Sequence, residues 1–411
     1  MDYTRSAIIS IFVSALLLLG LLFPQSSRAQ TGESYQFVPA PDIWYNSVDG
    51  IRLGVRLRGK MSGSFRDGPH RLDAGLWLGT KIPTHPVSYY LSLTEPIPSF
   101  SDFGSEANIQ IRSSYRTGFQ AHGISFNKRW QAGFDEKNYT EISLGLHAEH
   151  RFDAEYLLYS QLWQNQWLYP LTFQLLKTHS NALGRSRITA KATANVLGKH
   201  QDFITGQLSL QQHIPLSESF EISGRFFTSL ASKNTAPEYL YTRSMKSARG
   251  WMNSGLTRAR GTIPPAWMRT GGIQVAGGSN LRGYLHRDIA ALNNDNTPLY
   301  TSLSSINMEL RYPNPLDHAL NNIPVLGKFI SLRSYLFFDG GTSLGLTELE
   351  ESKVLADAGP GFMFTLNIPD FLGKSRGLMI RYDMPLWLSD PGPENHFKFR
   401  NVVGIGTIIS L

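Results

Sequence analysis

Residues 51–58 alternate strictly between apolar and other side chains and read Ile51-Arg52-Leu53-Gly54-Val55-Arg56-Leu57-Arg58. A helix repeats every 3.6 residues, whereas successive side chains of a strand point to opposite faces, so a period of two predicts a β-strand. One face of this strand is apolar and the other is basic.

The same alternation returns in residues 141–149, 187–196 and 204–211. In a soluble sandwich the polar faces point outward, whereas in a membrane barrel they line the lumen and the apolar faces meet lipid. Several of the apolar faces are thin, as at Ala190, Ala192 and Ala194, which suits lipid better than a sandwich core. The sequence therefore predicts an all-β fold, a transmembrane antiparallel β-barrel.

Strand-like segments begin near residues 50, 71, 87, 107, 121, 138, 168, 185, 202, 220, 303, 329, 357, 376 and 397. Bacterial barrels close with even numbers of strands. Residues 232–276 could hold one further strand or two, so we expect sixteen strands in one barrel domain over residues 44–411. Long connections are expected outside the cell and short ones in the periplasm.

The N-terminus has the features of a targeting segment. Arg5 precedes an apolar run from Ala7 to Leu22, and Ser27-Arg28-Ala29 fits a small-x-small cleavage site. A membrane anchor is the alternative, but the run is short for a spanning helix. We expect a signal peptide over residues 1–29, a short periplasmic lead over residues 30–43, and a location in the bacterial outer membrane.

The amino-acid composition limits the kinds of partner that this chain is expected to bind. The chain has no cysteine, which excludes disulfides and thiolate metal sites, and its formal net charge is +7. A secreted chain without a basic helix argues against nucleic acid, so lipid and lipopolysaccharide phosphates are the expected partners. Basic residues gather between positions 233 and 269, either to touch lipopolysaccharide or simply as a solvated loop; they are Lys233, Arg243, Lys246, Arg249, Arg258, Arg260 and Arg269.

Nothing in the sequence indicates catalysis. His147 and Glu149 share one face of a strand, but no nucleophile stands at a suitable spacing. His150 points the opposite way from His147, which makes the two a poor metal pair. We expect no enzymatic activity, no cofactor and no metal site.

Two strand-like segments carry charges toward the lumen. In residues 305–312 the apolar face leaves Asn307, Glu309 and Arg311 inward, and in residues 330–341 it leaves Phe337 and Asp339 inward. Ahead of them lies a polar stretch, Gly277-Gly278-Ser279-Asn280-Leu281-Arg282-Gly283-Tyr284. A planar guanidinium can bond two carboxylates, so we predict that this loop enters the barrel and that Arg282 binds Glu309 and Asp339. The three glycines would allow it to turn tightly.

These stretches resemble the bacterial surface antigen superfamily, which includes the BamA- and TamA-type outer-membrane assembly factors and two-partner secretion transporters. Leu281-Arg282-Gly283-Tyr284 is similar to the tip of that family's sixth loop, and Phe337-Phe338-Asp339-Gly340-Gly341 to its F-x-D-x-G strand. Asn307-Met308-Glu309-Leu310-Arg311, residues 45–54, and the later segments 358–361 and 381–386 also resemble family strands.

The resemblance implies a sixteen-stranded barrel with the sixth extracellular loop folded inside and anchored by Arg282 to the wall. It implies a tip motif of Leu281, Arg282, Gly283 and Tyr284, with lumenal partners Glu309, Arg311, Phe337, Asp339 and Gly341. It also implies insertion or translocation of a polypeptide client through a pore that opens between the first and last strands.

Three departures from the family are visible: position 281 is Leu, the chain ends in Leu411 rather than an aromatic residue, and residues 30–43 are too few for a periplasmic transport repeat. Client capture would then need a separate periplasmic partner. The alternative function is a passive pore or structural barrel that handles no client.

Overall fold

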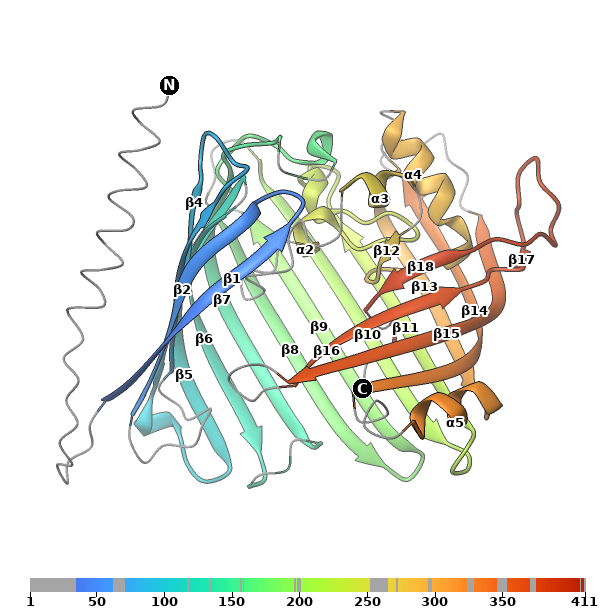
Figure 1. Ribbon diagram of the computed structural model, residues 1–411, viewed down its shortest axis with the longest axis horizontal. Coiled ribbons are helices and arrows are strands. Elements are labelled where there is room, and N and C mark those ends of the chain that lie inside the picture. Colours follow the sequence, from blue (N-terminus) through green and yellow to red (C-terminus); the bar gives the residue numbers. More distant parts are fainter. Residues whose placement is uncertain are drawn as a thin grey trace.

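The computed structural model describes residues 35–409 except 62–70, 117, 134, 136, 156, 158, 196, 198–200, 252–264, 271–272, 295–297, 324–328, 346–352, 370–374 and 407. The described residues form one 18-stranded sheet that curves into a barrel (Figure 1). The expected all-β barrel fold is confirmed. The expected signal peptide, residues 1–29, lies outside the described residues.

The strands of the sheet are β1 (Tyr35–Asn46), β2 (Gly50–Met61), β3 (Arg71–Gly79), β4 (Val87–Pro96), β5 (Ser105–Arg116), β6 (Phe119–Gln131), β7 (Tyr139–Arg151), β8 (Pro170–Asn181), β9 (Gly184–Asn195), β10 (Phe203–Pro215), β11 (Glu221–Ala231), β12 (Ile273–Val275), β13 (Tyr300–Arg311), β14 (Ile330–Gly345), β15 (Val354–Pro369), β16 (Ser375–Asp383), β17 (Trp387–Leu388) and β18 (Val402–Ile405). Each long strand pairs antiparallel with the next long strand along the chain, with β13 following β11. This up-and-down order keeps most backbone hydrogen bonds inside the wall, as a bilayer requires.

Helical turns are confined to the connections. They are η1 (Pro98–Phe100), η2 (Ser160–Leu162), η3 (Pro237–Tyr239), α2 (Ala248–Trp251), α3 (Pro265–Arg269), η4 (Arg282–Tyr284), α4 (Leu285–Asn293) and α5 (Pro315–Asn321). None of the helices in the described part of the chain has the length and apolar character needed to cross a membrane.

The wall is apolar outside and polar inside. On β2, Ile51 is 51 % exposed while its neighbour Arg52 is 1 % exposed. On β13, Ile306 is 51 % exposed while Asn307 is fully buried. Large apolar side chains are thus on the outer surface and charged ones are enclosed, which reverses the arrangement of a soluble domain and is expected when lipid covers the outside.

The first hairpin shows how local sequence sets a turn. The side-chain oxygen of Asn46 accepts hydrogen bonds from the backbone N–H groups of Val48 and Asp49 at 2.9 and 2.8 Å. Gly50 then takes φ +72°, where a Cβ would be strained. An Asx turn followed by a left-handed glycine reverses the chain between β1 and β2.

The long connection after β11 is the sixth at its end of the barrel. The connections at that end cover residues 47–49, 80–86, 117–118, 152–169, 196–202 and 232–299. Residues of the last segment contact the inner wall, and its helices gather at the top of Figure 1. Tyr45 lies at this same end, beside the β1–β2 turn.

Two boundaries differ from the predictions. The lead expected over residues 30–43 is wrong from Tyr35 onward, because β1 begins there and pairs along its whole length with β2. Residues 232–276, expected to hold one strand or two, contribute the short β12 to the described sheet. The last strand begins at Val402 rather than near residue 397. β1 was not predicted from the sequence. It contains Pro39 and Pro41, and proline within a segment argues against a strand.

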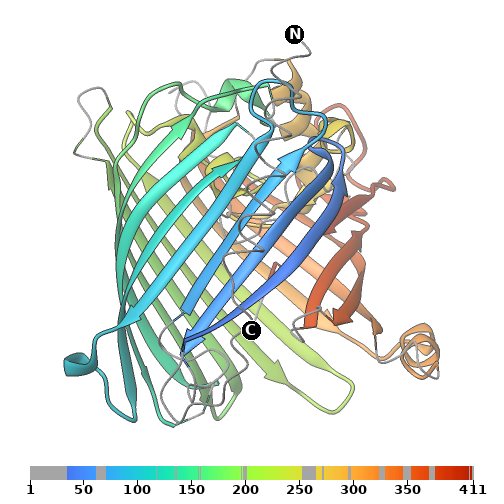
Figure 2. The ribbon, with the colours of Figure 1, turned by 60° about the vertical axis from the view of Figure 1, so that its left-hand side comes forward.

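The two ends of the sheet do not pair with each other in the described residues. β1 pairs with β2 alone, and Figure 2 shows it in dark blue at one edge, with the red C-terminal strands at the other. β18 pairs antiparallel with β16, and the same residues pair in parallel with β12 of the long loop. The edge of β18 that could meet β1 is therefore occupied, and the expected count of sixteen wall strands stays a prediction.

Candidate functional site

The tip of the long loop reaches the inner wall through a tight turn. Gly278 has φ +68° and Asn280 has φ +57°, and a Cβ on Gly278 would lie 2.6 Å from the ring of Tyr241. The side chain of Asn280 accepts a hydrogen bond from the N–H of Gly277 at 2.7 Å, which closes the turn. The predicted need for glycine at 277 and 278 agrees with this geometry.

Arg282 follows this turn and is fully buried. Its Nε donates to Asp339 Oδ2 at 2.8 Å, its Nη2 to Glu309 Oε1 at 2.9 Å, and its Nη1 to Asp383 Oδ1 at 3.2 Å. The carboxylates come from β14, β13 and β16 respectively. One loop cation therefore ties together three wall strands, and the contacts expected with Glu309 and Asp339 are present.

Neutral groups complete the surroundings of the guanidinium. Its carbon lies 4.0 Å from the ring centroid of Phe337, which supports the planar group from one side. Asn307 donates to Asp339 Oδ1 at 2.9 Å and to the carbonyl of Ser279 at 3.0 Å. Asn307 thus binds both the wall carboxylate and the loop, which fixes the position of the tip.

The other tip residues pack against β15 and β17. Leu281 and Tyr284 are buried with Leu355 and Leu388. Gly283 has no left-handed backbone; its constraint is space, since a Cβ there would lie 2.8 Å from the Cβ of Asp357. The glycine at 283 therefore permits close approach to the wall, a different reason from that at Gly278.

Two predicted partners lie elsewhere. Arg311 forms an ion pair with Glu221 at 3.7 Å, and both side chains are partly exposed. Gly341 faces β13, where a Cβ would lie 2.7 Å from the carbonyl oxygen of Ser304. The structure therefore brings neither residue to Arg282.

Sequence reasoning missed Asp383 and Arg381 as members of this cluster. Arg381 donates to Asp383, to the carbonyl of Gly406 at 2.8 Å, and to the side chain of Gln274 on β12 at 2.8 Å. Gln274 in turn donates to the carbonyl of Ser244 at 2.6 Å. The inward parity of Arg381 and Asp383, two residues apart on a strand, was the available signal.

A second contact holds the same loop to the opposite wall. Glu149 on β7 is 3 % exposed and accepts hydrogen bonds from Arg249 Nε at 2.6 Å and from the hydroxyl of Tyr239 at 2.7 Å. Arg249 lies on α2 and Tyr239 on η3. Burial also raises the pKa of the neighbouring Glu238 to about 8, so this carboxyl is mainly protonated at neutral pH.

The middle of the loop is braced internally. Asp288 on α4 accepts hydrogen bonds from the backbone N–H and the hydroxyl of Ser244, at 2.8 and 2.6 Å. Burial raises the pKa of Asp288, and the bonds from Ser244 act against that rise. Through Ser244 and Gln274 this brace is continuous with Arg381 and the tip cluster.

The basic run of the loop points largely inward. Arg243 lies 4.5 Å from the ring centroid of Tyr300, Arg249 binds Glu149, and Lys246 lines an internal cavity. Arg258 and Arg260 lie outside the described residues. Of the two alternatives for this run, lipopolysaccharide contact does not fit Arg243, Lys246 and Arg249, because they are turned into the lumen, whereas Lys233 and Arg269 are exposed.

The fold resembles that of BamA. The solved structure is BamA from Haemophilus ducreyi lacking POTRA domains 1–3, with 14 % sequence identity, a TM-score of 0.47, and coverage of 91 % of this chain and 71 % of that one. CdiB from Escherichia coli is also similar, with 12 % identity, a TM-score of 0.43, and coverage of 92 % of this chain and 63 % of that one. No family profile and no curated protein matches the sequence.

The tip cluster is arranged to hold a loop. The guanidinium is enclosed by acceptors and an aromatic ring, and its bonds join elements 27 to 101 residues apart in sequence. Replacing Arg282 would leave three carboxylates without the cation they share, which is costly inside a protein. The arrangement can therefore keep the loop in one position against the wall strands nearest the C-terminal edge of the sheet.

Proposed function

We propose that this chain is an outer-membrane barrel that inserts or translocates polypeptides together with a separate periplasmic partner. The observation that carries the proposal is the binding of Arg282 to Glu309, Asp339 and Asp383, since it fixes the sixth loop inside the barrel beside the last strands. The motifs quoted from the sequence match those of an assembly and secretion superfamily in order.

The edge strands support the same proposal. Proline has no N–H and is tolerated in a strand where that group would face away from the neighbouring strand. Pro39 and Pro41 lie within the uninterrupted pairing of β1 with β2. Their missing donors therefore belong to the other edge, which reduces the hydrogen bonds available for closing the barrel there. A weakly closed edge suits lateral passage of a strand-forming client.

Crosslinking in living cells tests the proposal. A photo-reactive residue at Val38, exposed on β1 at the end opposite the long loop, should trap an unfolded polypeptide or a periplasmic protein. The matched control is Leu216, which is exposed in the β10–β11 turn at the same end but away from the edge strands. Capture of lipid and the barrel itself alone, from well-folded and abundant protein, would contradict the proposal.

A passive pore is the second candidate. Two lumenal cavities of about 390 and 510 Å³ favour it, because polar side chains line most of both. Planar-bilayer recordings separate the candidates: a passive pore should conduct steadily with the Arg282 cluster intact, whereas a client-handling barrel should conduct mainly when Arg282 is replaced.

A further inference from the structure

The larger lumenal cavity, about 510 Å³, lies between the wall and the inward-folded loop. Arg112 on β5 and Lys191 on β9 reach it from the wall, and Lys246 and Arg249 reach it from the loop. These side chains belong to three separate parts of the chain and line one space. Lys191, Lys246 and Arg249 lie close enough for their positive charges to repel one another.

The cavity has few carboxylates to balance these cations. Glu149 is the one acidic side chain among the described residues that line it, and it is bound by Arg249 and Tyr239. In the described part of the chain, Arg112, Lys191 and Lys246 form no ion pair, and the Nε of Arg112 is buried without a hydrogen-bond partner. Cations in an enclosed space without counter-charges favour an anionic ligand.

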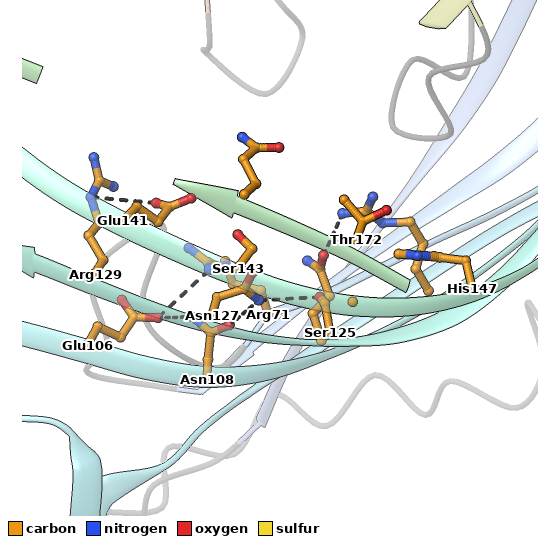
Figure 3. A pocket seen from close by; sticks show the side chains of 14 residues that line it. Arg71, Glu106, Asn108, Ser125, Asn127, Arg129, Glu141, Ser143, His147 and Thr172 are labelled. Carbon is orange, nitrogen blue, oxygen red and sulfur yellow. Dashed lines mark hydrogen bonds and ion pairs between the residues drawn. The ribbon is translucent and has the colours of Figure 1, made fainter. Parts of the chain in front are cut away.

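The adjoining cavity provides an internal comparison. It measures about 390 Å³ and shares Arg112 and His147 with the larger one. Figure 3 shows its lining, with Arg129 beside Glu141. There Arg71 pairs with Glu106 at 3.9 Å and Arg129 with Glu141 at 3.8 Å. Among the described residues, the two arginines that line only the smaller cavity are thus paired with carboxylates, whereas Arg112, which lines both cavities, and Lys191 and Lys246 of the larger one are not.

The remaining lining of the larger cavity consists mostly of donors. It includes the hydroxyls of Thr193, Thr205, Ser229 and Ser247. Lysine binds phosphate as a point charge, arginine binds it through a planar fork, and hydroxyls can donate to the remaining oxygens. Cations on both sides of the space suit a ligand with several charged groups better than a single small anion.

We propose that this cavity binds a soluble anion carrying two or more phosphate groups, with Arg112, Lys191 and Lys246 as its charged contacts. The site goes beyond the proposed polypeptide function and does not depend on it. Its two sides are the wall and the loop, so a bound oligophosphate would bridge them beside the Glu149–Arg249 contact.

Calorimetry with sodium tripolyphosphate, on the full barrel in a nonionic detergent at low salt, tests the site. The wild type should bind one equivalent, and Lys191→Gln/Lys246→Gln should weaken binding at least tenfold. The matched control, Lys177→Gln/Lys353→Gln, removes the same charge from exposed positions and should bind like the wild type. Inorganic sulfate at equal ionic strength should bind at least tenfold more weakly than tripolyphosphate.

Absence of binding to the wild type, equal binding by the cavity variant, or equal affinity for sulfate would overturn the proposal. A second measurement avoids any dependence on folding of the variant. In the wild type, tripolyphosphate should slow reductive methylation of Lys191 and Lys246 several-fold and leave Lys177 unaffected, as followed by mass spectrometry. If tripolyphosphate slowed methylation equally at all three lysines, or at none of them, the proposal would also be overturned.

Discussion

The long loop is held at two places whose electrostatics differ. At the tip, Arg282 is fully buried and faces three carboxylates, so acidic groups outnumber the loop cation. At the other wall, Arg249 has a side chain 25 % exposed and faces the single carboxylate of Glu149, with Lys191 and Lys246 nearby. The loop supplies the arginine in both cases, but the wall offers three carboxylates at the tip and only one, beside the wall cation Lys191, at Arg249.

Because of this difference, we expect the two contacts to respond differently to substitution. At the tip, three carboxylates share one buried cation. Losing that cation would leave the carboxylates to repel one another where little solvent can screen them. At Arg249 the lumenal cavity admits water, and screening limits the loss. The tip should therefore dominate the stability of the loop, and the Glu149 contact should adjust its position.

The largest expected effect is that of Arg282→Ala. It leaves Glu309, Asp339 and Asp383 without their shared cation and should lower the free energy of unfolding by about 3–5 kcal/mol. Urea unfolding in detergent micelles measures the loss. Arg311→Ala is the control, since its partly exposed pair with Glu221 should be worth about 0–1 kcal/mol. Equal losses in the two variants would contradict the assigned role of the tip.

Asp339→Asn should follow, with a loss of about 2–4 kcal/mol. Asn retains one acceptor but turns an NH2 group toward donors of Arg282 and Asn307, which both bond Asp339. The heat-resistant compact band on a gel should disappear at a lower temperature than for the wild type. Asp357→Asn is the control: Asp357 pairs in register with Asp339 but makes no ion pair with Arg282, so its neutralisation should cost less.

The wall could be predicted from the sequence because its period is local. Alternation placed Glu309 and Asp339 on the inner face, and the cation of a glycine-rich loop, Arg282, was predicted to be their partner before the family resemblance added to that prediction. The strand at Tyr35–Asn46 was not predicted, because two of its outward positions are Pro39 and Pro41. The same outward apolar face includes Phe37, Ile43 and Tyr45.

The contacts of the loop could not be read in this way. Arg249 lies 100 residues after Glu149, and Arg282 lies 101 residues before Asp383. Parity predicts that Glu149 and Asp383 face the lumen, but no local pattern specifies which loop residue reaches each. The path of the loop depends on packing across the barrel, and for that reason the sequence left its basic residues as either a lipopolysaccharide contact or a solvated loop and did not predict the pairing of Arg249 with Glu149.

Glu149→Gln probes the weaker of the two contacts. This substitution should lower the free energy of unfolding by about 2–3 kcal/mol. The loss is smaller than that of a fully enclosed pair, because Arg249 is partly solvated. Hydrogen exchange should rise in residues 237–251 and stay unchanged in residues 277–284. The double variant Glu149→Gln/Arg249→Gln should recover part of the loss, since it also removes the unpaired cation; no recovery would count against an ion-pair origin.

Tyr239→Phe should have the smallest effect, about 1 kcal/mol, because it removes one hydrogen bond to Glu149 and keeps the ring that packs on Phe203. Tyr241→Phe is a matched control that removes a hydroxyl bonded to the neutral side chain of Gln207. A bond to a charged acceptor is worth more than one to a neutral acceptor, so Tyr239→Phe should shift the urea midpoint further. Equal shifts would mean that Glu149 is not ionised, and the electrostatic difference between the two loop contacts would then be smaller than their geometry indicates.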